Sequence, residues 1–365
     1  MKILVINTVP TTQNGITNVI FNYLTSMDMD GMQMDYLSIN NPDVSYVYDV
    51  ERRGGKLFVV PRDWKHILSY YKSLKHIVGK GDYDIVHIHG NSHFNVLDLY
   101  AAYKGGCKNR IVHCHNTTCG SPLLHRLLTP LFNGLYTNGF ACGKDAGRWM
   151  FGERPFTVIN NGVNTSKYKF RNEIRKMLRK ELGWEHNFVI GNVASMIPAK
   201  NHKFIIDVFN ELCLANPDSR LLLIGDGYLK KEIEQQIANK GLEDKVHMTG
   251  NIDNVNEYLN VMDCILMPSL YEGLPLSLIE QQANGLRCLV TTTVSSEADK
   301  TGNLKFLPLQ TPMDMWVECL RRYEDETMLS RSERSGMAIE KIRNAGYSIG
   351  EESKKVKEIY KKLVR

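Results

Sequence analysis

The stretch DCILMPSLYEGLPLSLIEQQANG, residues 263–285, carries the signals from which the fold is predicted. It begins with an apolar run that is typical of a buried strand, and Pro268 ends that run. Gly273 allows a tight turn, and Pro275 suits the first turn of a helix, where its missing N–H is harmless. The helical pattern then continues to Gly285. A strand, a turn and a helix in this order are the repeating unit of a parallel α/β sheet.

Short β-branched runs alternate with amphipathic segments through the rest of the chain. In the first half, strands are predicted at 2–7, 33–39, 57–60, 84–88, 110–114, 138–141 and 156–160, and helices at 16–27, 64–79, 94–104, 121–136 and 144–151. In the second half, strands are predicted at 188–194, 219–224, 245–249, 263–267 and 286–291, and helices at 201–215, 228–240, 253–261, 275–284 and 350–364. Many of the strand runs are apolar at successive residues, as in strands that are buried on both faces. The order therefore predicts βαβ units and mainly parallel sheets.

The length of 365 residues exceeds what one hydrophobic core usually spans, so two domains are expected. The pattern of strands and helices starts again after the polar segment 161–167, which is typical of a linker. We predict an α/β protein with two doubly wound domains, 1–165 and 166–349, and two such domains of similar size imply a cleft between them. Ligands of these sheets bind outside the carboxyl ends of the strands, so the loops at those ends are the places to search for a site.

Charge and hydropathy exclude several classes of protein. Lys and Arg number 45 against 40 Asp and Glu, which gives a net charge of +5. That charge is too small for a nucleic-acid binder without a basic stripe, but it is enough for weak attraction to anionic lipid or phosphate groups. No apolar run approaches the ~20 residues of a membrane span. The N-terminus is similar to a first strand and lacks the features of a signal peptide, so we expect a cytoplasmic protein.

Neither a metal nor another cofactor is expected. The eight cysteines are scattered, and the segment 113–119, which contains two of them with two histidines, lacks the regular spacing of a zinc site. The aspartates at 28 and 30 and those at 82 and 84 have Asp-x-Asp spacing. The first pair lies in a predicted helix-end loop and the second opens a predicted strand, so solvated carboxylates are the favoured interpretation of both.

The turn before the helix at 275–284 is the strongest candidate for a binding site. A turn that leads into a helix N-terminus presents free amides to an anion, and here they belong to Gly273, Leu274, Leu276 and Ser277. Glu272 precedes this turn, and Glu280 follows it along the helix. A nucleotide diphosphate sugar fits the layout, with the diphosphate on the amides, one carboxylate on the ribose and the other on the sugar. A capped helix with two solvated glutamates fits the spacing equally well.

The glutamate pair belongs to a larger set of motifs. Glu272 and Glu280, with the surrounding Pro-Ser-Leu-Tyr-Glu-Gly-Leu-Pro, resemble the E-x7-E motif of retaining family 4 glycosyltransferases of GT-B fold. Further segments resemble motifs of that family, in order along nearly the whole chain: 14–18, 84–89, 111–116, 160–164, 200–202 and 225–227. Segments 141–147 and 280–285 are similar to bacterial exopolysaccharide and capsule transferases in particular. The resemblance implies two Rossmann-like domains that face a cleft, with the terminal helix, 350–365, returning to the first domain.

The resemblance also implies roles for individual residues. Glu280 would bind the ribose of the nucleotide, and Glu272 would contact the hydroxyls of the donor sugar. Lys200 would neutralise the diphosphate, which the amides of residues 273–277 and Gly15 of the first domain would hold. His115 would reach the transferred sugar, and the base would be held through backbone atoms of Asn251 and Ile252.

Some of these residues have simpler explanations, and two positions depart from the family pattern. Lys200 fits an ordinary surface lysine, and His115 fits a satisfied histidine at a strand end; the histidines at 87, 89 and 113 are interpreted as structural. Ser195 stands where similar transferases carry an arginine, so the phosphate would depend on Lys200 and the amides. Asn14 stands in place of the first of two glycines; asparagine tolerates a positive φ better than most residues, so the loop can survive.

The acceptor side is expected on two helices of the first domain. Helix 121–136 is rich in leucine, and helix 64–79 combines Trp64, Leu68 and other apolar residues with several lysines. Such stripes could dock a lipid-linked acceptor at the membrane face, although core packing is the commoner reason for them.

The function that the resemblance implies is that of a retaining, metal-independent hexosyltransferase. It would move a sugar from a nucleotide donor, with UDP as the expected nucleotide, to a growing surface or exopolysaccharide glycan, and the acceptor would be a glycan or a lipid-linked glycan. Peripheral contact with the cytoplasmic face of the membrane is part of this expectation. Two alternatives stay open: a nucleotide-sugar epimerase of the same architecture, and a degenerate nucleotide- or glycan-binding protein, which Ser195 keeps in consideration.

Overall fold

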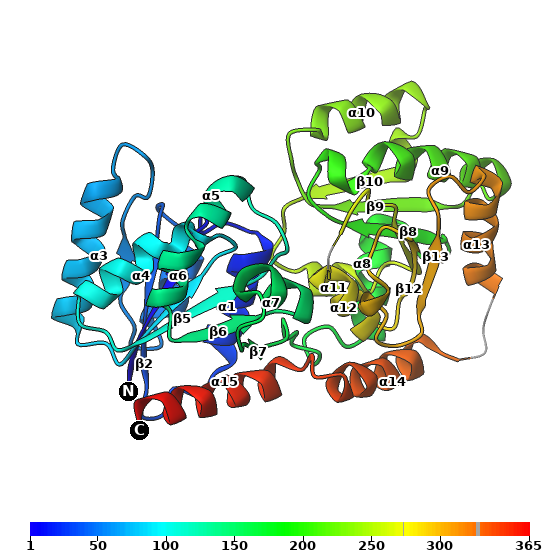
Figure 1. The fold of residues 1–365 in the computed structure, drawn as a ribbon. Helices are drawn as coiled ribbons and strands as arrows, with labels where there is room; N and C mark the ends of the chain where they lie inside the picture. Colours follow the sequence, from blue (N-terminus) through cyan, green and yellow to red (C-terminus); the bar gives the residue numbers. More distant parts are fainter. Residues whose placement is uncertain (273, 326–328) are drawn as a thin grey trace. The chain divides into compact units, whose positions relative to one another are not determined.

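The computed structural model describes residues 1–272, 274–325 and 329–365, and these form two compact units (Figure 1). The first unit consists of Met1–Gly162 and Gly346–Arg365, and the second of Val163–Ala345. Each unit is a parallel sheet with helices on both faces, so the prediction of two doubly wound, Rossmann-like units is confirmed. The terminal helix α15 (Ile349–Val364) belongs to the first unit, as expected.

The sheet of the first unit has seven strands in the order β3-β2-β1-β4-β5-β6-β7, and its neighbouring strands are parallel. The strands are β1 (Lys2–Asn7), β2 (Gln33–Ser38), β3 (Leu57–Val59), β4 (Ile85–His89), β5 (Asn109–Cys114), β6 (Asn138–Ala141) and β7 (Thr157–Val158). Successive side chains point to opposite faces, so Leu4 and Ile6 pack into one core while Val5 lies on the other face.

Helices cover both faces of this sheet. The core around Leu4 and Ile6 is closed by α3 (Ile67–Gly81), α4 (Val96–Lys104), α6 (Thr129–Leu135) and α7 (Lys144–Phe151). On the face of Val5 lie α1 (Gly15–Ser26) and α15, which contact each other. The short helices α2 (Val44–Glu51) and α5 (Pro122–Leu127) complete the unit.

The sheet of the second unit has six parallel strands in the order β10-β9-β8-β11-β12-β13. The strands are β8 (Val189–Val193), β9 (Arg220–Ile224), β10 (Val246–Gly250), β11 (Cys264–Met267), β12 (Arg287–Thr291) and β13 (Leu304–Leu307). The helices are α8 (Asn172–Leu182), α9 (His202–Ala215), α10 (Lys230–Asn239), α11 (Val255–Tyr258), α12 (Leu276–Ala283), α13 (Met313–Asp325) and α14 (Arg331–Asn344).

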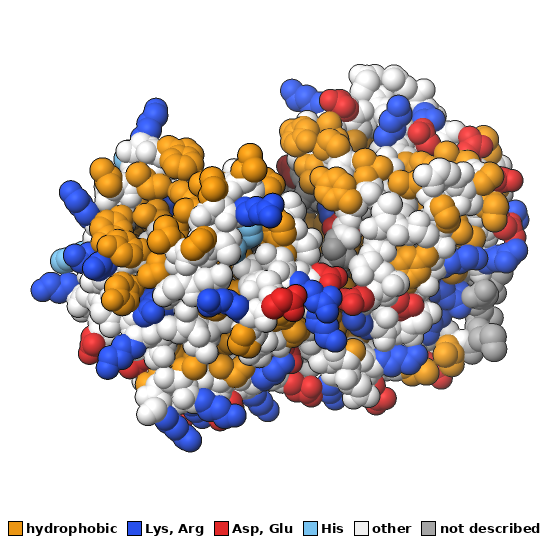
Figure 2. Space-filling model, in the orientation of Figure 1, with side chains coloured by type: hydrophobic (Ala, Val, Ile, Leu, Met, Phe, Trp, Pro, Cys, Tyr) orange, Lys and Arg blue, Asp and Glu red, His pale blue; other side chains and the backbone are white. Residues whose placement is uncertain are grey.

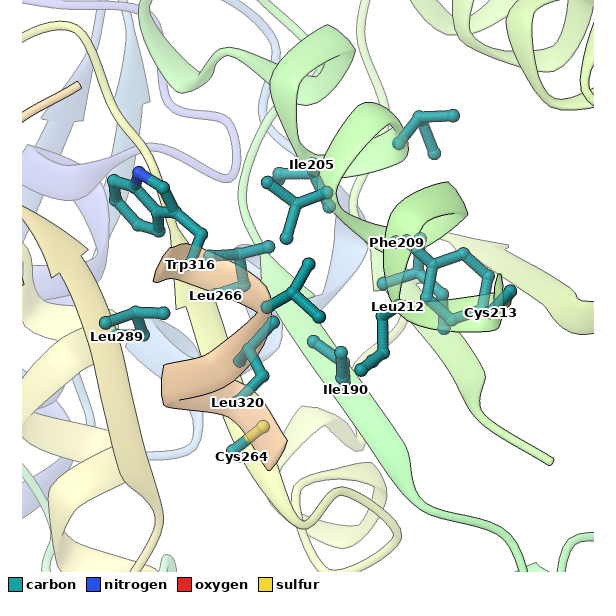
Figure 3. Close-up of a cluster of buried hydrophobic side chains, with 14 of the residues drawn as sticks. Ile190, Ile205, Phe209, Leu212, Cys213, Cys264, Leu266, Leu289, Trp316 and Leu320 are labelled. Atoms are coloured by element: carbon teal, nitrogen blue, oxygen red, sulfur yellow. The ribbon is translucent and has the colours of Figure 1, made fainter. Parts of the chain in front are cut away.

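Two cores hold this unit together, one on each face of the sheet. One core joins α9, α10 and α13 to the sheet and contains Phe209, Leu266 and Trp316, all fully buried (Figure 3). The other core joins α8 and α12 to the opposite face, through Leu178 and Leu278. The central strands are therefore apolar on both faces, which explains the continuous apolar runs of the sequence.

Several elements differ from the prediction. The helix expected at 121–136 is two helices, α5 and α6, because Pro130 has no N–H with which to continue the first of them. The predicted ranges also omit α2, α8, α13, α14 and β13. α2 buries only Val50 and α8 consists mainly of charged residues, so neither has a broad apolar stripe.

The core of the second unit yields a test of the fold. Phe209→Ala is expected to lower the free energy of unfolding by about 3–5 kcal/mol, because it removes a fully buried ring between α9 and the sheet. Leu214→Ala on the same helix is the control, since Leu214 is 75% exposed. Urea unfolding of both variants measures the difference, and equal losses in the two variants would contradict the described packing.

Candidate active site

The predicted donor residues of the second unit gather at one edge of its sheet. The strand order places β8 between β9 and β11, so the connections leave β8 and β11 in opposite directions, and loops at such a point diverge to leave room for a ligand. The loop after β8 contains Lys200, and the loop after β11 contains Glu272. The carboxyl ends of parallel strands lie at the same edge, which is why these distant residues meet.

The motif Gly225-Asp226-Gly227 lies in the loop after β9, at the same edge of the sheet. A Cβ atom on Gly225 would lie 2.2 Å from the carbonyl oxygen of Ala194, and one on Gly227 would lie 2.4 Å from that of Met196. Gly225 also has a φ of +133°, which side chains rarely allow. The motif therefore lets the loop after β9 pack directly on the loop after β8.

Lys200 is held by a tight turn at the start of α9. Residues Pro198–Lys200 form a 3-10 turn, and Asn201 takes the left-handed conformation with a φ of +56° before the helix begins. The Asn201 side chain donates to the carbonyl of Pro268 at 3.2 Å, and the amide of Leu270 donates to the carbonyl of Ala199 at 2.8 Å. Two hydrogen bonds thus tie the lysine turn to the loop after β11.

Lys200 and Glu272 form an ion pair between Nζ and Oε1. Both side chains are mostly buried, with exposed fractions of 22% and 15%, and burial lowers the pKa of Lys200. Lys200 is therefore not an ordinary surface lysine. The backbone on the Glu272 side is fixed as well, because the carbonyl of Ser269 accepts hydrogen bonds from Thr291 and Thr293 at 2.7 and 2.5 Å.

The predicted anion-binding segment precedes α12, and its first residue, Gly273, lies outside the described residues. Leu274 packs against the core of α8 and α12, and Pro275 is the N-cap rather than the first residue of the helix. Leu276 and Ser277 are the first two helical residues, whose amides have no intrahelical acceptor and are available to an anion.

Glu280 lies on the second turn of α12 and is half-buried. Burial raises its pKa to about 7, and a hydrogen bond from Tyr168 opposes that shift. The side-chain amide of Asn284, the C-cap of α12, donates to the carbonyl of Tyr168 at 2.9 Å, so the backbone at 168 is held at the end of α12. The sequence gives no signal for Tyr168, because an isolated aromatic residue after a linker has no recognisable pattern.

Asn251 and Ile252 directly follow β10, at the same edge of the sheet. Asn251 is exposed, and Ile252 packs partly against the core below it. Gly250 precedes them with a φ of +68°, and its carbonyl accepts from the amide of Gly225 at 2.9 Å. The predicted base-binding residues thus continue the row of loops that contains Lys200.

In the first unit, Gly15 is the exposed first residue of α1. Asn14 has a φ of −138°, which is ordinary extended backbone, and its side chain accepts from the amide of Thr17 at 3.0 Å. The expectation that Asn14 relies on a tolerance of positive φ is therefore wrong. Asparagine stands here because it caps α1.

His115 follows β5 and is joined to a second histidine. Its Nε2 lies 2.8 Å from Nδ1 of His89, and its amide donates to the side chain of Asn91 at 2.8 Å. Burial lowers the pKa of His115 to about 4, so the ring is neutral at physiological pH. The other ring nitrogen, Nδ1, is buried, and a hydrogen bond with the side chain of Asn161 opposes the lowering of the pKa.

The other histidines of this face lie beneath His115. His87, His89 and His113 are buried, and one nitrogen of each lies within 4.8 Å of those of the other two, which is the spacing of a potential metal cluster. Their rings are within 4.2 to 5.4 Å of one another, and His87 bonds Tyr360 of α15 at 2.5 Å. The aspartates with Asp-x-Asp spacing have other partners, since Asp28 pairs with Lys357 and Asp84 accepts from the amide of Lys2.

Comparison with known proteins defines the class. A model described as glycosyltransferase family 4 matches residues 13–167, and one described as glycosyl transferases group 1 matches residues 174–324. The two matches cover both units, which together define a glycosyltransferase of GT-B fold. The chain belongs to the family 4 glycosyltransferases.

Similar proteins span most of the chain. The putative glycosyltransferase EpsF of Bacillus subtilis (strain 168) is 29% identical over 85% of this chain and 84% of its own. The Escherichia coli UDP-Gal:alpha-D-GlcNAc-diphosphoundecaprenol alpha-1,3-galactosyltransferase is 27% identical over 83% and 80%. The crystal structure of Anabaena HepE in complex with UDP has the same fold, with a TM-score of 0.80 at 17% identity over 99% of this chain and 100% of that one.

The raised pKa of Glu280 predicts how stability depends on pH. In the unfolded chain this carboxyl ionises near 4.5, whereas in the folded unit it ionises at about 7, so unfolding releases a proton between these values. The stability of the wild type therefore falls as pH rises through this window. Glu280→Gln removes the penalty and is expected to be more stable than the wild type by about 1–3 kcal/mol at pH 8, with little difference at pH 4.5.

Urea unfolding at the two pH values measures this effect. The exposed Glu234 of α10 offers a matched control, because Glu234→Gln makes the same chemical change outside the site. A Glu280→Gln variant that is less stable than the wild type at pH 8 would show that the ionised carboxylate is well accommodated and that the burial argument is wrong.

Proposed function

We propose that this protein is a retaining glycosyltransferase that moves a sugar from a UDP-linked donor to a growing surface glycan. The observation that supports this most directly is the ion pair of Lys200 and Glu272, which lies at the diverging loops of the second sheet beside the start of α12. A cation, free helix amides and two carboxylates are what a nucleotide diphosphate sugar requires. UDP is chosen because HepE was crystallised with UDP and the Escherichia coli relative is named for a UDP-sugar donor.

The proposed chemistry follows the movement of charge. Breaking the bond between the sugar and the diphosphate leaves positive charge on the sugar and negative charge on the leaving group. Once the donor is bound, Lys200 and the amides of Leu276 and Ser277, at the positive end of the α12 dipole, stabilise that negative charge. Glu280 binds the ribose and Glu272 the sugar hydroxyls. The acceptor attacks from the side of the leaving group, and the departing phosphate takes its proton.

The donor is proposed to belong to the second unit, and the reacting sugar and acceptor to involve the first. Gly15 at the start of α1 would add its amide to the diphosphate, and Asn251 and Ile252 would hold the base. His115, which follows β5 at the carboxyl edge of the first sheet, would reach the transferred sugar. Transfer then requires the two units to close on one donor, which would also exclude water.

The acceptor is proposed to be a lipid-linked glycan approached from the membrane surface. In α5 and before α3, three large apolar side chains are exposed to about the same degree: Leu123 by 79%, Leu127 by 76% and Trp64 by 75%. Core packing does not account for these residues, although it does for Leu74 and Phe132. Figure 2 shows hydrophobic side chains mixed with lysine and arginine on this surface of the first unit, a pattern suited to an anionic bilayer. No helix in the described ranges is long and apolar enough to cross a membrane.

The alternatives make different predictions for turnover. An epimerase would release an altered nucleotide sugar without an acceptor, and a degenerate binding protein would show no turnover. Ser195 is exposed and supplies no positive charge to the diphosphate. It therefore favours the binding protein only if Lys200 and the amides cannot stabilise the leaving diphosphate by themselves. Release of UDP from UDP-sugars in the presence of a polyprenyl-diphosphate-linked glycan identifies a transferase. Conversion of the nucleotide sugar in the absence of an acceptor separates an epimerase from a binding protein.

The division of roles between the units predicts a separation of binding from transfer. His115→Ala is expected to leave UDP affinity unchanged and to reduce sugar transfer about tenfold or more, because one hydrogen bond to the reacting sugar is lost. Isothermal titration with UDP and a transfer assay measure the two effects. The exposed His186 provides the control as His186→Ala. Loss of UDP binding in folded His115→Ala, or unchanged transfer, would refute the assignment.

Transfer is expected to survive EDTA, because the proposed site stabilises the leaving diphosphate with Lys200 and amides and requires no metal ion. The assay compares initial rates in EDTA and in added magnesium or manganese. Complete loss in EDTA that either ion restores would contradict the proposed mechanism and direct attention to the aspartates with Asp-x-Asp spacing.

A further inference from the structure

The ion pair of Lys200 and Glu272 places two groups with opposing tasks in direct contact. Under the proposed function, Lys200 binds the diphosphate and Glu272 binds the hydroxyls of the sugar. A diphosphate and Glu272 are both anionic, and both require the same ammonium group. Binding of a nucleotide therefore exchanges one anionic partner of Lys200 for another.

The backbone around the pair limits how far either residue can move away. The turn at Lys200 and the loop at Glu272 are joined by the hydrogen bonds from Asn201 and Leu270. A parallel bridge between Glu272 and Val294 fixes the far side of the loop. Separation of the two charges must then come from side-chain rotation, and Glu272 stays near the site when Lys200 turns to the diphosphate.

The consequence differs between a nucleotide that carries a sugar and one that does not. With a nucleotide sugar, the sugar hydroxyls donate to Glu272 and replace the lost ammonium group. With a bare nucleoside diphosphate, Glu272 is left as a mostly buried carboxylate without a cation, next to further negative charge. Leaving such a group unpaired costs more than the pair itself contributes.

We infer that Glu272, as the internal counter-ion of Lys200, makes the site select sugar-bearing diphosphates over the bare nucleoside diphosphate. This inference rests on the proposed function. It gives Glu272 a second task, since after transfer the diphosphate no longer carries the sugar and Glu272 takes Lys200 back. The carboxylate that binds the donor sugar thus also promotes release of the nucleoside diphosphate product, by pairing with Lys200 again.

The test is the affinity for UDP of a variant that lacks only the charge. Glu272→Gln is expected to bind UDP three- to tenfold more tightly than the wild type, although the residue lies in the donor site. In a transfer assay, UDP should also become a stronger inhibitor relative to the donor. A Glu272→Ala variant removes the same carboxylate and should bind UDP more tightly as well. Agreement between the two variants excludes an effect of the glutamine side chain itself.

A matched control separates this effect from a change in net charge. Asp207 pairs with Lys240 at 3.1 Å in the same unit, away from the loops of the site, with comparable partial exposure. Asp207→Asn changes the net charge equally and should leave UDP affinity unchanged.

Each result decides between the claims. Tighter UDP binding by both Glu272 variants, with Asp207→Asn unchanged, supports the inference. Equal or weaker binding by folded Glu272 variants overturns it while leaving the proposed donor site intact, provided that the wild type binds UDP. An equal gain in Asp207→Asn overturns it in favour of a general charge effect. Absence of UDP binding in the wild type and in all variants would refute the proposed donor and the inference together.

Discussion

The contact between Lys200 and Glu272 depends on one geometric constraint, namely that parallel strands end at the same edge of their sheet. Seventy-two residues apart in the sequence, the two side chains meet because β8 and β11 are neighbours. The loops that follow these strands are then joined by hydrogen bonds from Asn201 and Leu270. Nothing in this arrangement requires a long-range side-chain network, since the sheet itself sets the separation of the loops.

The remaining features of the second unit maintain that edge. Gly225 and Gly227 remove the side chains that would separate the loops after β8 and β9. The cores on both faces fix the strands beneath the site, and the helix α12 places Glu280 against Tyr168. Burial raises the pKa of Glu280, and perturbed pKa values of this kind are frequent at functional sites.

In the first unit, the register of parallel strands likewise brings the histidines together. His89 and His113 are register partners on adjacent parallel strands, so their rings share one face with His87 on the same strand as His89. The terminal helix covers this face, with Tyr360 bonded to His87 and Lys357 paired with Asp28. The return of the last segment of the chain thus buries the row of histidines from which His115 projects.

Much of this could be predicted from the sequence, for identifiable reasons. The strands flanked by glycine and proline, and the start of α12 after Pro275, follow from local patterns that the tertiary structure does not override. The break at Pro130 was missed because apolar periodicity continued across it, and α8 because its apolar stripe is narrow. The capping role of Asn14 and the contacts of Tyr168 and His89 depend on three-dimensional neighbours. Residue spacing does not reveal such neighbours. The proximity of His89 to His115 could nevertheless have been inferred from the register of the strands β4 and β5.

The central claim is that Lys200 exchanges Glu272 for a diphosphate when the donor site is filled. A crystal structure of the full-length protein with UDP tests it most directly. We expect Lys200 Nζ within ~3 Å of a phosphate oxygen and out of contact with Glu272, with the Glu280 carboxylate on the ribose hydroxyls. UDP bound elsewhere, or bound at this edge while Lys200 still pairs with Glu272, would contradict the account.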